Sequence, residues 1–396
     1  MSSSSVGGES GCSSWIYCTN RTPSRAQLKP ENLDTDMPAE LEIENRLGEV
    51  PITLNKNRSM REESFTQKGD ILNWNDIVHS WEKYIENKEN TAHILENMDN
   101  SDKIYIPSTH RFSEEYQDKQ MAKFYSIENK ALEYFGSEGL TTVMLTLSAS
   151  PFDSSGQILP FTDHLDSLMD PDLGSWQAVK TAISRVLSDY DYNYMRILEP
   201  HTPDKGEYYT SGYAHQHVAL MIDDPDNELE DRDFKPVMDA HIRNCKTAGR
   251  EAHKVDSKSV SVEPYDEDEG NIGSYLTAYM GEYVKEDPTD SERWFKRFLA
   301  GLWASNRRRV GFSNGANEWA REDYKEKYKE SLREGKKQTA EEKQYEYYGI
   351  EKTKEDGETE EIEVENGNSG SYMTSSPYSS NDFVASVSNI WDRPYG

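Results

Sequence analysis

The chain has 396 residues, of which 44 are Lys or Arg and 73 are Asp or Glu, giving a formal net charge of −29 at pH 7. The mean hydropathy is −0.92, so part of the chain is expected to be solvated rather than packed in a core. Of the three cysteines, Cys12 and Cys18 lie in a leader rich in Ser and Gly, so the sequence supports neither a disulfide framework nor a cysteine zinc site. With no long apolar run for a membrane span or secretion signal, we predict a cytoplasmic protein without a membrane partner.

The acidic balance would repel nucleic acid in dilute buffer. The acids, however, are spread along the whole chain rather than collected in one tail, which is typical of proteins from salt-in halophiles. In molar salt the Debye length is only about 3 Å, so the local surface decides whether a phosphate is bound. Net charge therefore does not exclude DNA as a partner.

The N-terminal half of the chain is predicted to contain two regions. Residues 1–65 are polar and proline-containing without an apolar period, and we predict a disordered leader there. Residues 66–137 are predicted to form a helical lead-in, because Trp74, Ile77, Trp81 and Ile85 recur at helical spacing. A second helix is expected over about 113–135.

Residues 138–285 alternate between strand and helix patterns. Strands are predicted at 141–150, 194–200, 213–223 and 258–265, and helices at 175–190, 236–249 and 273–284. The order is βαββαβ followed by a helix, which is the ferredoxin-like split-βαβ arrangement of an antiparallel sheet with helices. The predicted fold class is therefore α+β, with helical flanks and disordered ends.

The C-terminal part is predicted to contain two further regions. Residues 286–350 are expected to be helical, basic and aromatic, with the sequence NRRRVGFSNGAN between two helices. Residues 351–396 are acidic and then rich in Ser, Gly and Asn, and we predict a disordered tail.

The clearest chemical signal is the pair His215 and His217 inside the apolar strand pattern YAHQHVALMID. Side chains alternate along a strand, so both imidazoles lie on one face and form a metal site that lacks a third ligand. The alternative, that the two histidines simply face solvent or bond their neighbours, is equally open for this pair alone. Glu199 ends the preceding strand, and an antiparallel return places it across from the histidines. A carboxylate with two imidazoles suits Mg²⁺ or Mn²⁺ and leaves positions open for a phosphate.

Tyr275 and Tyr279 lie four residues apart in the predicted helix GSYLTAYMGEYV, so both phenols project from one face. A phenol can attack a metal-polarised phosphodiester, and the phosphotyrosine retains the bond energy for religation. The alternative is a tyrosine stripe packed on the sheet as core, which Tyr283 would extend.

Three segments in this order resemble the motifs of HUH endonucleases, and in particular rolling-circle replication initiators of haloarchaeal plasmids and viruses. They are TTVMLTLSA, EPHTPDKGEYYTSGYAHQHV and YLTAY. The resemblance covers roughly residues 140–283. It implies an HUH domain at 138–285 in which His215, His217 and Glu199 bind a divalent metal, while Tyr275 and Tyr279 attack DNA.

One departure from the resemblance concerns a lysine that many family members carry within the tyrosine motif. This chain has Ala278 at that place. Lys285 is a candidate substitute for contact with the DNA phosphate, although ten residues from Tyr275 place it on a different helical face.

A DNA partner is supported independently by residues 293–317, which contain six Lys or Arg and no acid, interleaved with aromatic residues. Arg307, Arg308 and Arg309 form the densest cluster, and we predict that they contact DNA phosphates. Helix packing with extended arginines is the alternative for the first half of this stretch.

These features predict a rolling-circle initiator that nicks one strand, forms a 5′-phosphotyrosine and frees a 3′-OH primer. Its expected partners are single-stranded origin DNA and a host polymerase and helicase, since the sequence has no GxxxxGK[ST] loop. Two alternatives stay open. An HUH transposase or relaxase shares the chemistry, and a non-catalytic DNA-binding regulator would hold only a structural metal.

Overall fold

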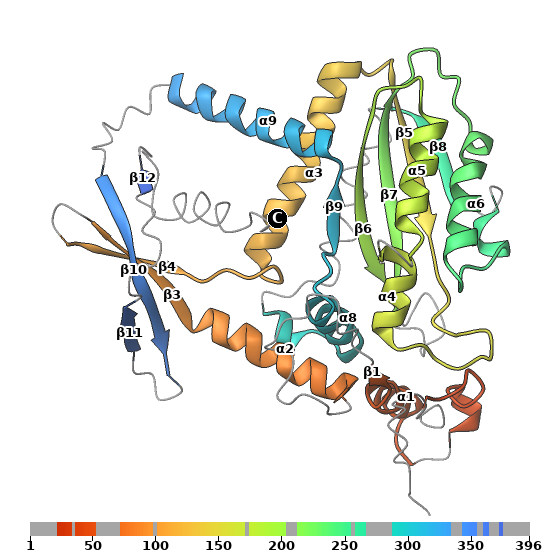
Figure 1. The fold of residues 1–396 in the computed structure, drawn as a ribbon, viewed down its shortest axis with the longest axis horizontal. Helices are drawn as coiled ribbons and strands as arrows, with labels where there is room; N and C mark the ends of the chain where they lie inside the picture. The colour runs from red at the N-terminus through yellow and green to blue at the C-terminus, as the bar shows by residue number, and fades with distance from the viewer. Residues whose placement is uncertain are drawn as a thin grey trace, which may run out of the picture.

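The computed structural model describes residues 22–33, 36–52, 72–97, 101–170, 174–202, 212–254, 258–266, 287–333, 343–354, 359–363 and 372–374. Its centre is a five-stranded antiparallel sheet in the order β8-β5-β7-β6-β9 (Figure 1). The strands are β5 (Leu140–Leu147), β6 (Tyr192–Pro200), β7 (Ala214–Asp223), β8 (Val260–Pro264) and β9 (Val310–Phe312).

The first four strands of this sheet, with two helices, form the ferredoxin-like order expected from the sequence. Helix α5 (Trp176–Val186) follows β5 and helix α6 (Lys235–Asn244) follows β7. Numbered along the chain, the four strands lie in the spatial order 4-1-3-2, and every neighbour pairs antiparallel. The fold class is thus α+β, as predicted. Helix α4 (Phe161–Met169) is an insertion before α5.

Each face of the central sheet is covered by helices (Figure 1). On one face, Val143, Leu145 and Leu220 pack against α5 and α6. On the other face, Ile197 and Met221 pack against the long helix α3 (Glu114–Phe135). This division follows from the period of two in the strands, which sends alternate side chains to opposite faces.

Helix α3 begins and ends where the sequence predicts. Ser113 caps its first turn by accepting a hydrogen bond from the backbone N–H of Tyr116 at 3.3 Å. Gly136 ends it at φ +73°, a conformation that glycine adopts without steric cost. Helix α9 (Asn314–Arg333) follows β9 and packs on α3 through Phe135 and Trp319.

The prediction of a disordered leader over residues 1–65 is wrong for the described residues 22–33 and 36–52. Helix α1 (Ala39–Gly48) buries Ile43 and Leu47, one turn apart, in the core formed with α2 (Trp74–Glu89) and α8 (Arg293–Ala304). A buried ion pair between Glu44 and Arg297 at 3.0 Å joins α1 to α8. Two apolar residues one turn apart give little local signal, because they are buried only by packing on separate helices, and α8 lies about 250 residues away in the chain.

A second antiparallel sheet also departs from the predicted organisation. It has the order β11-β10-β3-β4, with β12 paired to β10. Its strands are β3 (Thr91–Asn97), β4 (Lys103–Pro107), β10 (Lys343–Thr353), β11 (Thr359–Glu363) and β12 (Tyr372–Thr374). The lead-in is therefore not all helical, and part of the tail expected to be disordered forms strands. Strand β10 pairs with β3, a contact of very high sequence separation that local patterns do not report.

The remaining elements are short. They are η1 (Pro30–Asn32), η4 (Asp231–Phe234), η5 (Glu251–His253), η7 (Pro288–Asp290) and the pair β1 (Pro51–Ile52) and β2 (Leu72–Asn73). In the described part of the chain, no helix combines the length and the apolar character that crossing a bilayer requires.

Candidate metal centre

Two neighbouring strands bring the three predicted metal ligands together. Glu199 near the end of β6 is the register partner of His215 in β7, and His217 pairs with Ile197. Cross-strand partners place their side chains on the same face. The carboxylate and both imidazoles therefore converge on the face of the sheet that α3 covers farther along.

The three ligand atoms lie within hydrogen-bond distance of one another. Oε2 of Glu199 is 2.6 Å from Nε2 of His217 and 2.9 Å from Nε2 of His215. The two Nε2 atoms are 2.8 Å apart. Glu199 and His217 are buried, whereas His215 is half-buried. The site is thus open only on the side of His215.

These distances fit a divalent ion. Adjacent ligands of an octahedrally bound ion with bonds of about 2.1 Å are separated by about 3 Å, close to the spacings of the three atoms. Two imidazoles and a carboxylate are a suitable donor set for Mn²⁺ or Mg²⁺ and occupy only part of the coordination sphere. Among the described residues, this is the group of three or more His, Cys, Asp or Glu side chains that could hold a metal ion.

The pKa of Glu199 also suits a metal ligand. Burial raises this pKa, but hydrogen bonds from His215 and His217 outweigh that effect and lower it to about 2. The carboxyl group is therefore ionised throughout the neutral range. A buried carboxylate that faces two imidazoles offers a cation one full negative charge in a region with little water.

Two residues around the ligands were not assigned from the sequence. The hydroxyl of Thr146 on β5 lies 3.2 Å from Nδ1 of His217, and this contact leaves Nε2 to face the metal position. The ring of His201 lies 4.9 Å from the ring of His215. Burial and the neighbouring His215 lower the pKa of His201 to about 3, so this imidazole is neutral at pH 7. Its position two residues after Glu199 was the available sequence signal.

A third unassigned residue, His164 of α4, fixes the start of the ligand strand. Its Nε2 lies 2.7 Å from the carbonyl oxygen of Ala214, the residue before His215. His164 is fully buried and packs edge-on against Tyr213, with ring centroids 5.1 Å apart. The insertion α4 therefore holds β7 at the point where the candidate metal ligands begin.

The predicted nucleophiles Tyr275 and Tyr279, together with Lys285, lie outside the described residues. The described chain reaches residue 266, just after β8, and continues at residue 287. Their assignment stays a prediction from the sequence.

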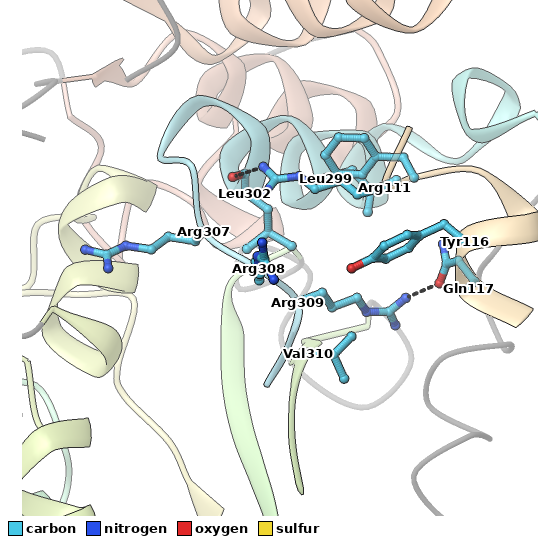
Figure 2. A pocket seen from close by; sticks show the side chains of 10 residues that line it. Arg111, Tyr116, Gln117, Leu299, Leu302, Arg307, Arg308, Arg309 and Val310 are labelled. Carbon is cyan, nitrogen blue, oxygen red and sulfur yellow. Dashed lines mark hydrogen bonds between the residues drawn. The ribbon is translucent and has the colours of Figure 1, made fainter. Parts of the chain in front are cut away.

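The structure separates the three arginines that the sequence groups together. Arg307 forms ion pairs with Asp166 at 2.9 Å and Asp170 at 3.3 Å, both at α4. Arg309 extends the opposite way and donates to Oε1 of Gln117 at 3.2 Å (Figure 2). Arg308, between them, is exposed. Thus two of the three guanidinium groups have partners within the protein.

Comparison with known proteins identifies one matching family and two related haloarchaeal proteins. A family model described as "Putative rep protein (DUF1424)" matches residues 52–369. An "Uncharacterized 36 kDa protein" of Halobacterium salinarum is 34% identical over 258 residues, which are 62% of this chain and 76% of that protein. A protein with the same description from Halobacterium sp. (strain GN101) is 32% identical over 277 residues, 67% of this chain and 78% of the relative. No solved structure matches the chain. The matched range includes the central sheet with all three candidate ligands, and the chain belongs to this Rep family.

Proposed function

We propose that this protein is a rolling-circle replication initiator, a metal-dependent nicking endonuclease and strand-transferase of the HUH type. The observation that carries the proposal is the convergence of Glu199, His215 and His217 on one face of a ferredoxin-like sheet. Membership of a Rep family supports a role in replication initiation. The order of the sequence motifs supports nicking by tyrosine.

The residues have distinct proposed roles. Glu199, His215 and His217 would hold Mg²⁺ or Mn²⁺, which when bound polarises the scissile phosphate. Thr146 and His164 would orient the two histidine ligands. Thr146 contacts the His217 ring, and His164 contacts the backbone next to His215.

In the proposed nicking step the phenol oxygen of Tyr275 forms a bond to phosphorus, and the bond from phosphorus to the 3′ oxygen breaks. The phenol loses its proton and the departing oxygen gains one, leaving a 5′-phosphotyrosine and a free 3′-OH. A host polymerase would extend that end with the help of a host helicase. Tyr279 would act when a round of replication ends.

The test is nicking of a supercoiled plasmid that carries the cognate origin, with Mg²⁺ or Mn²⁺ at high salt. We expect open circles with the unaltered protein, and none after His217→Ala or after addition of EDTA. His79→Ala, a change of an exposed histidine on α2, serves as the matched control and should nick normally. Specific origin binding without any nicking would favour the non-catalytic regulator. Nicking only at transposon ends or a transfer origin would favour the transposase or relaxase.

A further inference from the structure

A pocket beside the metal centre is lined by four arginines. Arg111 lies just before α3, and Arg307, Arg308 and Arg309 precede β9, while Tyr116 contributes an aromatic wall (Figure 2). None of the described residues that line this arginine pocket is acidic. In a chain with 73 acidic residues against 44 basic ones, such a local excess of cations marks a place for an anion.

The arginines of the pocket differ in what they can do. The ion pairs of Arg307 with two aspartates already neutralise its charge. Arg309 is fixed by Gln117 and stacks near the rings of Phe295 and Phe298, 5.8 Å from each centroid. Arg308 is the exposed member. It is thus the guanidinium best placed to meet a ligand from solvent.

The backbone places Arg308 close to the metal ligands. The Leu198 N–H donates to the Arg309 carbonyl oxygen at 2.8 Å, which continues the antiparallel register of β6 with β9. Leu198 precedes Glu199 in the chain and Arg308 precedes Arg309, so this hydrogen bond brings the arginine segment next to the strand end that carries Glu199.

Two further cations, Lys123 and Arg321, lie near Arg308. Lys123 of α3 lies 4.1 Å from the centroid of the Phe312 ring and donates to Asn317. Burial lowers the pKa of Lys123 to about 8, and the charges of Arg321 and Arg308 contribute. Arg308 and Arg321 are therefore close enough to act on Lys123.

We propose that the arginine pocket binds a phosphate of the single DNA strand, next to the phosphate held at Glu199, His215 and His217. Arg308 contacts this phosphate, and Arg309 is a positioning residue that shapes the pocket wall. Arg307 serves only the structure, through α4. This inference rests on the proposed function, because it takes DNA as the ligand of the metal centre.

The test measures binding of a fluorescein-labelled oligothymidine of about 20 nucleotides to the full chain across KCl concentrations, with EDTA present. Arg308→Ala should weaken binding about tenfold, as expected for the loss of one charge-assisted contact. It should also reduce the slope of log affinity against log salt by about 0.7, the value for one single-strand phosphate. Arg308→Lys should restore the slope, because it restores the charge.

The matched control is Arg185→Ala, an exposed arginine on α5 at the opposite face of the sheet, which should bind like the unaltered protein. Equal effects of Arg185→Ala and Arg308→Ala would overturn the proposal, as would an equal effect of Arg308→Ala on a duplex of the same length. The measurement needs no metal and no cleavage. An unchanged slope in a protein that still nicks would refute phosphate binding in the arginine pocket and leave the proposed nicking function standing. A reduced slope in a protein that never nicks supports the pocket and refutes the nicking function.

Discussion

The Thr146 hydroxyl and Nδ1 of His217 are 3.2 Å apart across strands β5 and β7. When Nε2 of His217 holds a metal ion, Nδ1 carries the proton and donates it to the hydroxyl. This contact fixes the ring orientation of a buried ligand. It also connects strand β5 to the candidate metal centre.

Thr146→Val should therefore weaken Mn²⁺ binding by about tenfold or more, the usual effect of losing an outer hydrogen bond to a ligating histidine. Isothermal titration with Mn²⁺ measures this directly. Thr142→Val is the control, because Thr142 lies on the same strand but bonds the carbonyl oxygen of Glu263 instead. Equal Mn²⁺ affinities for the two variants would show that Thr146 does not support the ligand.

The buried pair of Glu44 and Arg297 should stabilise the docking of α1. Both side chains are almost fully buried, at 3% and 6% exposure. Glu44→Leu would leave the Arg297 cation buried without this carboxylate, and the free energy of unfolding should fall by about 3–5 kcal/mol. Denaturant unfolding measures the change.

Two companion variants make this stability test specific. Adding Arg297→Met to Glu44→Leu should recover most of the loss, since an apolar pair can replace a buried ion pair. Glu42→Ala breaks the more exposed pair with Arg46 on the same helix and should cost under about 1 kcal/mol. A Glu44→Leu protein as stable as Glu42→Ala would contradict the ordered leader.

His241 should make the fold sensitive to mild acid. Its Nδ1 lies 2.8 Å from the hydroxyl of Ser175, and its Nε2 lies 2.8 Å from the carbonyl oxygen of Ser148. Burial lowers the pKa of His241 to about 4, below the value of about 6.5 in an unfolded chain. A proton therefore binds the unfolded state more tightly. The contribution of His241 is complete above about pH 6.5 and decreases as the pH falls toward 4.

Between pH 7 and pH 5, this single histidine should lower the free energy of unfolding by about 2 kcal/mol. Denaturant unfolding at the two pH values, at constant salt and with EDTA, measures the difference. His241→Gln should remove that share of the pH dependence, whereas His79→Gln, at an exposed position on α2, should retain it. The same pH dependence in both variants would exclude His241 as the origin.

The ferredoxin-like sheet was predictable because its strands have clear periods and succeed one another in the chain. The convergence of Glu199, His215 and His217 was predictable for the same reason, since period two aligns the two histidines and a short return places Glu199 opposite. Strand β9 and the pairing of β10 with β3 were not, because they depend on contacts between residues far apart in sequence. The arginine cluster shows the limit at a single site. Composition identified residues 307–309, but only packing shows that Arg307 bonds two aspartates and Arg309 bonds Gln117.

The last prediction concerns the two tyrosines. Their spacing lets both phenols address one phosphate, and Tyr275 aligns with the leading tyrosine of the motif that the sequence resembles. Tyr275→Phe should abolish initiation. Tyr279→Phe should still nick but release fewer closed single-stranded circles, because a second nucleophile is needed when the round ends.

The assignment can be read from the covalent adduct. A DNA fragment labelled at the end downstream of the nick becomes attached to the protein, and mass spectrometry of the modified peptide identifies the tyrosine. We expect Tyr275 in the first turnover, and trapping with the Tyr279→Phe protein should give the same peptide. An adduct only at Tyr279 would reverse the two roles. One at Tyr283 would place the active face two helical turns later than proposed, because each turn contains 3.6 residues.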